Sequence, residues 1–151
     1  MQRAIDDARS GVDAGDGGPF GAVIVKDGVV LATCHNTVLL DNDPTQHAEV
    51  RAISKASRKI GSFDLSGCEI YSTTEPCPMC FSAIHWARIN TLYYGTTIDD
   101  VRKLGFNELT IPAAAMKDIG KSPIKIVPSF LFEKCAELLG YWERTSNSKV
   151  Y

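Results

Sequence analysis

The strongest constraint on the fold comes from two short segments, Gln46-His47-Ala48-Glu49 and Pro76-Cys77-Pro78-Met79-Cys80. One imidazole and two thiolates are typical zinc ligands, and three protein ligands leave the fourth tetrahedral position to a water molecule, as in catalytic sites. The fold must bring the two segments together to use them. We predict that His47, Cys77 and Cys80 bind one Zn²⁺ ion per subunit.

The local spacing agrees with such a centre. Pro76 fits a non-helical approach to a helix, and Cys77 and Cys80, three residues apart, then share one side of its first turn. The helix dipole favours thiolates there. His47 and Glu49 are two residues apart and can converge only at the start of a helix. Glu49 is therefore predicted to be a proton shuttle beside the metal.

Other interpretations of the cysteine pair are a structural zinc site and a thioredoxin-like redox pair. A structural site needs a fourth ligand, and His35 and His85 are the only other histidines. The remaining cysteines are expected to pack in the core. They are Cys34, Cys68 and Cys135.

The periodicity of apolar residues predicts an α/β fold. Helices are expected before the glycines at 15–18 and over 46–60, 77–87 and 129–139, with a short helix over 97–104 capped by Thr97. Strands are expected over 20–25, 29–34, 68–72, 90–95 and 124–127, and a polar loop over 40–45. Asp27-Gly28 indicates a hairpin between the first two strands. The predicted architecture is a three-layer α/β/α sandwich with a mixed five-stranded sheet.

Composition narrows the class of protein. The chain has 151 residues, 44% hydrophobic and 23% charged, which predicts a single globular domain over 1–151. Its formal charge of -2 offers no basic field for a phosphate backbone, so nucleic-acid binding is disfavoured. No apolar run has the roughly 20 residues that cross a bilayer. Five cysteines with one close pair favour a reducing, cytoplasmic location.

The sequence resembles the cytidine deaminase-like superfamily of zinc deaminases, whose signature H-x-E…P-C-x-x-C it matches. Within that superfamily it is most similar to guanine deaminases and plant-type guanosine deaminases. The resemblance rests on Gly17 to Val25, His35-Asn36, Asn42 to Thr45, His47-Ala48-Glu49, Glu75 to Cys80, Ala83-Ile84, Trp86 to Arg88 and Gly105 to Glu108.

The resemblance also implies substrate contacts. Asn36 and the backbone of Ala48 are expected to face a purine base, and Glu108 its amino end, where it can help to move protons. Three aromatic residues are expected at the pocket; packing is the alternative role for the first two, and a frayed C-terminal tail is the alternative for the third. They are Phe20, Trp86 and Tyr151.

The implied activity is hydrolysis of a purine 2-amino group, guanine giving xanthine and ammonia. Guanosine, cytosine-type pyrimidines and adenosine in tRNA are the alternative substrates, and a catalytically silent zinc-binding module is the alternative of another class. A small nucleobase or nucleoside and a homodimer are the expected partners. The C-terminal segment, about 129–151, is a candidate for exchange between the two subunits.

Overall fold

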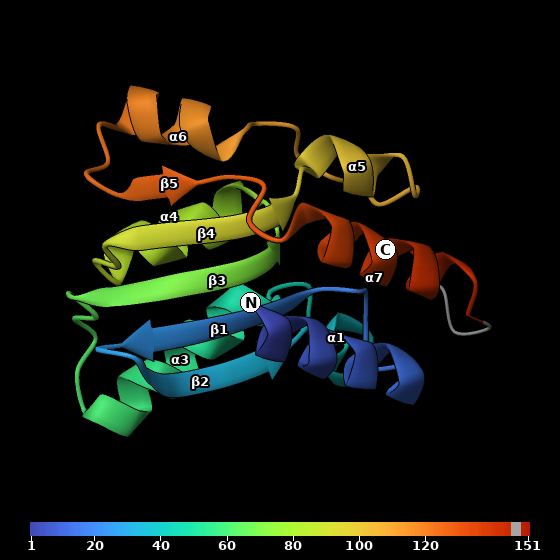
Figure 1. The fold of residues 1–151 in the computed structure, drawn as a ribbon, viewed down its shortest axis with the longest axis horizontal. Helices are drawn as coiled ribbons and strands as arrows, with labels where there is room; N and C mark the ends of the chain where they lie inside the picture. Colours follow the sequence, from blue (N-terminus) through green and yellow to red (C-terminus); the bar gives the residue numbers. More distant parts are fainter. Residues whose placement is uncertain (146–148) are drawn as a thin grey trace.

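The computed structural model describes residues 1–145 and 149–151, and it is built around one five-stranded sheet (Figure 1). The strand order is β2-β1-β3-β4-β5. The strands are β1 (Gly21–Lys26), β2 (Val29–His35), β3 (Cys68–Thr74), β4 (Thr91–Thr96) and β5 (Lys125–Val127). The helices are α1 (Gln2–Ala14), α2 (Val38–Asp41), α3 (Ala48–Ile60), α4 (Pro78–Trp86), α5 (Ile98–Arg102), α6 (Ala113–Gly120) and α7 (Phe132–Glu143).

Strand directions follow from the connections. β1 pairs antiparallel with β2 and β3, whereas β3, β4 and β5 run parallel. The tight turn between β1 and β2 has positive φ at Asp27 (49°) and Gly28 (76°), as a type I′ hairpin requires. Helices connect the parallel strands, because the chain must return from the end of one strand to the start of the next over a face of the sheet. This confirms the predicted mixed sheet.

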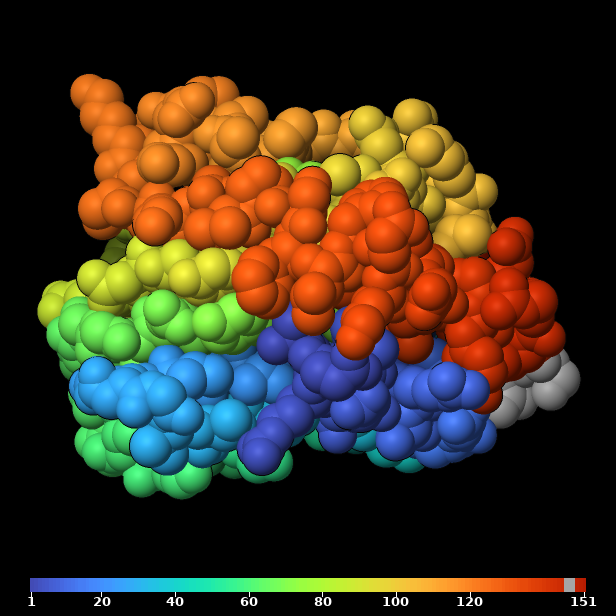
Figure 2. Space-filling model, viewed as in Figure 1, coloured from blue at the N-terminus to red at the C-terminus, as the bar shows by residue number. Residues whose placement is uncertain are grey.

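Helices cover both faces of the sheet. Figure 1 shows α3 and α4 behind it and α1 and α7 in front, and Figure 2 shows α1 and α7 side by side on the surface. On the α3–α4 side, Ile24, Ile70 and Leu92 belong to one buried cluster with residues of both helices. A second cluster joins α1 and α7 through Val12 and Trp142. A third cluster joins the same two helices through Ile5 and Leu138, so the helices on each side of the sheet have their own buried apolar clusters.

Most predicted elements are confirmed, with three differences. The predicted loop at 40–45 is preceded by the single turn of α2, and α6 had no counterpart in the prediction. The last helix begins at Phe132 and continues to Glu143, later than predicted at both ends. Its start is delayed because Ser129 and Leu131 have positive φ, which α-helix does not allow. No helix among the described residues is long and apolar enough to span a bilayer.

The outer edge of β2 is covered by side chains from α3. Arg51 Nη1 donates to the carbonyl oxygen of His35 at 2.6 Å, and Lys59 Nζ donates to that of Val30 at 3.2 Å. Lys55 Nζ lies 3.4 Å from the carbonyl oxygen of Thr33. The charged ends of these long side chains thus bind backbone carbonyls of the edge strand.

Candidate active site

The predicted metal ligands lie at the starts of two helices. His47 is the N-cap of α3, with extended φ and ψ of −69° and 149°, and Cys77 is the N-cap of α4, at −62° and 167°. Pro78 occupies the first position of α4, where its missing N–H costs no hydrogen bond. Since β3 leads directly into α4, both helix starts lie beside the carboxyl ends of the parallel strands, the usual place for a site in an α/β sheet.

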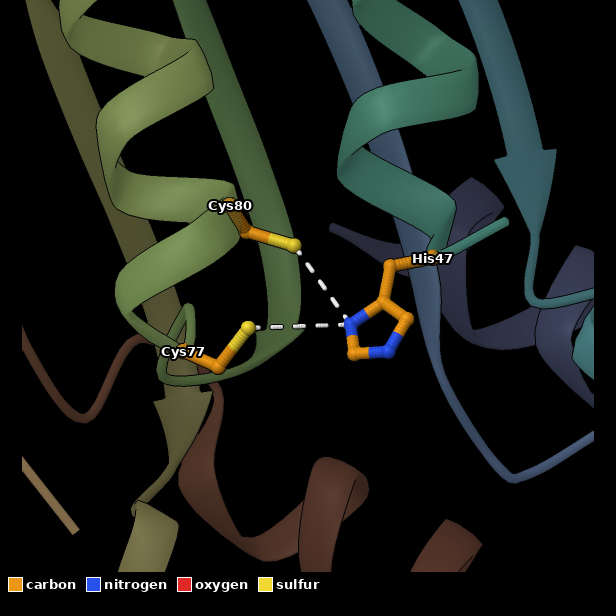
Figure 3. A group of neighbouring side chains, drawn as sticks. All are labelled: His47, Cys77 and Cys80. Atoms are coloured by element: carbon orange, nitrogen blue, oxygen red, sulfur yellow. Dashed lines mark hydrogen bonds between the residues drawn. The ribbon is translucent and has the colours of Figure 1, made fainter. Parts of the chain in front are cut away.

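The three donor atoms fit one zinc ion. They all lie within 4.8 Å of one another. His47 Nδ1 is 3.7 Å from Cys77 Sγ and 3.5 Å from Cys80 Sγ, as Figure 3 shows. Zn–S and Zn–N bonds of about 2.3 and 2.0 Å at tetrahedral angles imply donor separations of about 3.5 Å. His47, Cys77 and Cys80 therefore suit a zinc site with one open position.

The two thiols differ in acidity. A hydrogen bond with Cys80 lowers the pKa of Cys77 to about 4, against the opposing effect of its burial. The same shared proton, together with burial, raises the pKa of Cys80 well above the ordinary value. Cys77 is therefore the more acidic of the two thiols, and both cysteines would bind a metal as thiolates.

Glu49 lies beside the ligands, in the first turn of α3. Its side chain is buried, its Oε1 accepts a hydrogen bond from Ser72 Oγ at 3.1 Å, and its Oε2 is 3.5 Å from Cys80 Sγ. Burial raises the pKa of Glu49, with His47 opposing the shift. A raised pKa brings the protonated and ionised forms of the carboxyl group closer in free energy at neutral pH, which suits general acid–base catalysis. Ser72 was not anticipated, because nothing in its own segment of sequence shows that β3 passes under α3.

A cavity of about 310 Å³ opens at the metal ligands. Such a volume is at the lower end of small-molecule sites. Its lining includes four residues that were not singled out as contacts: Pro44, Met79, Phe106 and Leu109. The predicted residues in the lining are Phe20, His47, Cys77, Glu108 and Tyr151.

The aromatic wall of the cavity is continuous. Phe106 lies edge-on to Phe20, with ring centroids 5.1 Å apart, and edge-on to Tyr151 at 5.4 Å. The Tyr151 hydroxyl accepts a hydrogen bond from the Gly18 backbone N–H at 3.2 Å, so the tail returns to the site of its own chain. Exchange of the C-terminal segment between subunits stays a prediction.

Glu108 supplies an acidic group to this cavity. The side chain is half-buried, whereas the neighbouring Asn107 is exposed. Burial raises the pKa of Glu108, and the negative charge of Cys77 adds to the shift while His47 opposes it. Of the two residues, Glu108 is the one placed as the acidic group.

Asn36 and Ala48 lie behind the cavity lining and are almost fully buried. Asn36 Oδ1 accepts a hydrogen bond from the Val38 N–H at 3.1 Å. Its Nδ2 lies toward the Tyr151 hydroxyl but has no hydrogen-bond partner within the described part of the chain. A buried donor without an acceptor is costly, so this amide is available to a ligand.

Trp86 is not brought to this cavity. It is 78% exposed and lines a separate groove with Phe63 and Arg88. The reason is helical geometry: Ile84 points into the core, and a residue two positions later lies about 200° around α4. In this position the Trp86 side chain does not reach a base bound in the cavity of its own chain.

Comparison with known proteins agrees with this geometry. Residues 1–96 match the model of the cytidine and deoxycytidylate deaminase zinc-binding region. The guanine deaminase of Bacillus subtilis is 41% identical over 151 residues, 100% of this chain and 96% of the relative. A tRNA-specific adenosine deaminase of Agrobacterium fabrum is 45% identical over 95 residues, 63% of this chain and 62% of that protein.

A solved structure shows the same fold. It is described as the guanine deaminase from Nitrosomonas europaea and has a TM-score of 0.87 at 30% identity, with 96% of this chain and 83% of that chain covered. The family match spans both ligand segments and Glu49, which supports zinc as the cofactor. The chain therefore belongs to the cytidine and deoxycytidylate deaminase family of zinc hydrolases, which act on C–N bonds of cyclic amidines.

Proposed function

We propose that this protein is a guanine deaminase, which converts guanine and water to xanthine and ammonia. The observation that carries the proposal is that the metal ligands His47 and Cys77 line one cavity together with the acidic, aromatic wall that contains Glu108, while Glu49 lies next to the third ligand, Cys80. The guanine deaminase relative aligns with the whole chain, including this wall, whereas the tRNA deaminase relative aligns with 63% of it.

The residues divide the chemistry between them. Zinc, when held by His47, Cys77 and Cys80, lowers the pKa of a coordinated water and makes a nucleophile available at neutral pH. Glu49 accepts one proton of the attacking water and transfers it to the ring nitrogen next to the amino-bearing carbon. It then takes the second proton, from the hydroxyl group that the attack adds to this carbon, and delivers it to the amino group, which leaves as ammonia. Ser72 orients the carboxylate through its hydrogen bond to Oε1.

Other residues bind and orient the base. The free amide nitrogen of Asn36 offers a donor to an acceptor on the purine ring. Glu108 accepts a hydrogen bond from the exocyclic amino group, while Phe20 and Phe106 give the ring an apolar contact surface. The half-buried carboxylate of Glu108 favours a base that carries an amino group there, because an analogue without one leaves this acceptor unpaired.

The test is ammonia release from guanine, guanosine, cytosine, cytidine, adenine and a tRNA, for wild type and Glu49→Gln. We expect guanine to be the preferred substrate, and the Glu49→Gln variant to lose about 10²- to 10⁴-fold in kcat. Zinc content per chain, measured by metal analysis, should not change, because Glu49 is not a ligand.

Two results would overturn the assignment. Turnover of cytosine or a tRNA alone would exclude a purine 2-amino group as the substrate. A zinc-loaded wild type that releases ammonia from none of the six compounds would leave only a silent zinc-binding module.

We also infer that two copies of the chain associate through the groove beside α4. Phe63 and Trp86 are 70% and 78% exposed there, and the groove between them is lined by further apolar side chains, among them Ile53 and Pro123. A contiguous apolar surface of this kind is typical of an interface. A second copy presents the same patch, so an isologous contact buries both tryptophans at once.

A further inference from the structure

The segment that carries Glu108 has few internal supports. It runs from Ile98 to Ala113, between β4 and α6, and contains the short helix α5 and an irregular stretch after it. Its only contribution to the cavity is the run Phe106 to Leu109. After α5 it forms no regular element before α6. Its Glu108 N–H donates to the nearby Phe106 carbonyl, and its Asn107 N–H lies 3.5 Å from the carbonyl oxygen of Tyr151 in the C-terminal tail. Its position relative to the metal ligands must therefore be fixed from outside.

Glu75 holds both ends of this segment. Its Oε2 accepts a hydrogen bond from the Ile98 N–H at 3.2 Å, and its Oε1 accepts one from the Ala113 N–H at 2.8 Å. Ile98 and Ala113 are the first residues of α5 and α6, so a single carboxylate binds free N–H groups at two helix starts. A negative charge is favourable at both positions because of the helix dipoles.

The same residue is bound to the metal-ligand loop. Glu75 is buried, precedes Pro76-Cys77 in the chain, and its own N–H donates to the carbonyl of Thr96 at 2.8 Å. Its backbone is thus fixed at the ends of β3 and β4, two residues from Cys77. Through its side chain, this fixed point sets where the segment 98–113 begins and ends.

We infer that Glu75 is a positioning residue for the deaminase reaction: it holds Glu108 at a set distance from the metal by binding both ends of the segment that carries it. The inference rests on the proposed function, in which Glu108 binds the amino group of the base. It assigns to Glu75 no contact with the substrate. A purely structural role would stabilise the fold without favouring this segment.

The first test compares Glu75→Gln and Glu75→Ala with wild type. Gln keeps one acceptor oxygen and faces the second N–H with a donor, whereas Ala removes both acceptors. We expect KM for guanine to rise about tenfold in Glu75→Ala and less in Glu75→Gln, with kcat changed by less than about threefold and one zinc retained per chain. Glu69→Gln is the matched control, because Glu69 lies on β3 and accepts a bond from Tyr71 Oη. It should leave KM unchanged.

The second test is a double-mutant cycle with Glu108→Gln. If Glu75 acts through Glu108, the effect of Glu75→Gln on kcat/KM should largely disappear in the Glu108→Gln background, since coupled residues are not additive. Effects that multiply independently would overturn the inference. Loss of zinc in either Glu75 variant would also overturn it, because the residue would then act through the metal ligands.

Hydrogen exchange separates this inference from the proposed function, because it needs no substrate. In Glu75→Gln, amides of 98–113 should exchange faster than in wild type while those of α3 and α7 are unchanged. Unchanged exchange in 98–113 would overturn the positioning role even if guanine is the substrate. If wild type does not deaminate guanine, the proposed function fails and the exchange result still decides how the segment is held.

Discussion

At the scale of single residues, Gly11 lies where α1 meets the ring of His35. A Cβ atom at position 11 would lie 2.4 Å from His35 Cδ2. The ring cannot move aside easily, because its Nδ1 and Nε2 lie 3.1 and 2.9 Å from carboxylate oxygens of Asp7 and Asp16. The glycine is therefore required by packing and not by backbone conformation.

We predict that Gly11→Ala destabilises the protein although alanine is the better helix former. The propensity gain of about 1 kcal/mol offsets only part of the roughly 1–3 kcal/mol cost of overpacking, so the free energy of unfolding should fall by up to about 2 kcal/mol. Denaturant unfolding measures it. Gly140→Ala in α7 is the control, since its Cβ would meet only the mobile Arg144 side chain at 3.2 Å. A stabilised Gly11→Ala would show that the His35 ring is free to shift.

Residues of the site were predictable to different degrees. His47, Glu49, Cys77 and Cys80 could be identified because their chemistry depends on spacing within two short segments. Ser72 and Glu75 act through partners that only the folded chain brings near: Ser72 binds Glu49, and Glu75 binds Ala113. Trp86 was expected at the pocket or in packing beside Phe81 and Ile84, whereas it is exposed and outside the cavity lining, because it lies about 200° around α4 from Ile84.

Among the secondary-structure elements, the predicted zinc ligands lie at the starts of α3 and α4, two helices that also share a buried cluster with Ala52, Ala56 and Phe81. We predict that chelation of the metal lowers the melting temperature by roughly 5–10 °C. Zinc at about 100 times its dissociation constant contributes about 2.7 kcal/mol, and a chain of this size shifts by about 2–4 °C per kcal/mol.

Differential scanning fluorimetry with and without chelator measures this shift. Cys34→Ala, which alters a buried cysteine outside the centre, should retain it, and Cys80→Ala should abolish it. An identical shift in Cys80→Ala would mean that the chelator acts elsewhere.

The strands were easier to predict than the helices that were missed. Alternating and β-branched residues identify β1 and β2, and Asp27-Gly28 identifies their turn. α2 is a single turn, too short to show periodicity, and α6 begins with three alanines that define no apolar face. Their formation depends on tertiary contacts, such as the bond from the Ala113 N–H to Glu75.

The proposed association of two copies through the groove with Phe63 and Trp86 is a property of the molecule as a whole. We predict that wild type is a dimer at micromolar concentration and that Trp86→Glu is a monomer, because a charge at the centre of an apolar interface is left without a partner. Sedimentation equilibrium measures both. Leu40→Glu is the control. Leu40 is an exposed apolar residue (59%) that does not line the groove, so this variant should stay dimeric. A dimeric Trp86→Glu variant would exclude the groove as the interface.

The basic side chains along β2 have a consequence for solubility. An open sheet edge is a template on which another chain can add a strand, and charged residues that occupy its carbonyls prevent this. Arg51 and Lys59 do so at one edge of the sheet, and at the other edge β5 has only three residues, too few to template a stable pairing. Both edge strands are thus poor templates for amyloid-like growth. The proposed association through the groove with Trp86 therefore need not compete with strand-to-strand polymerisation.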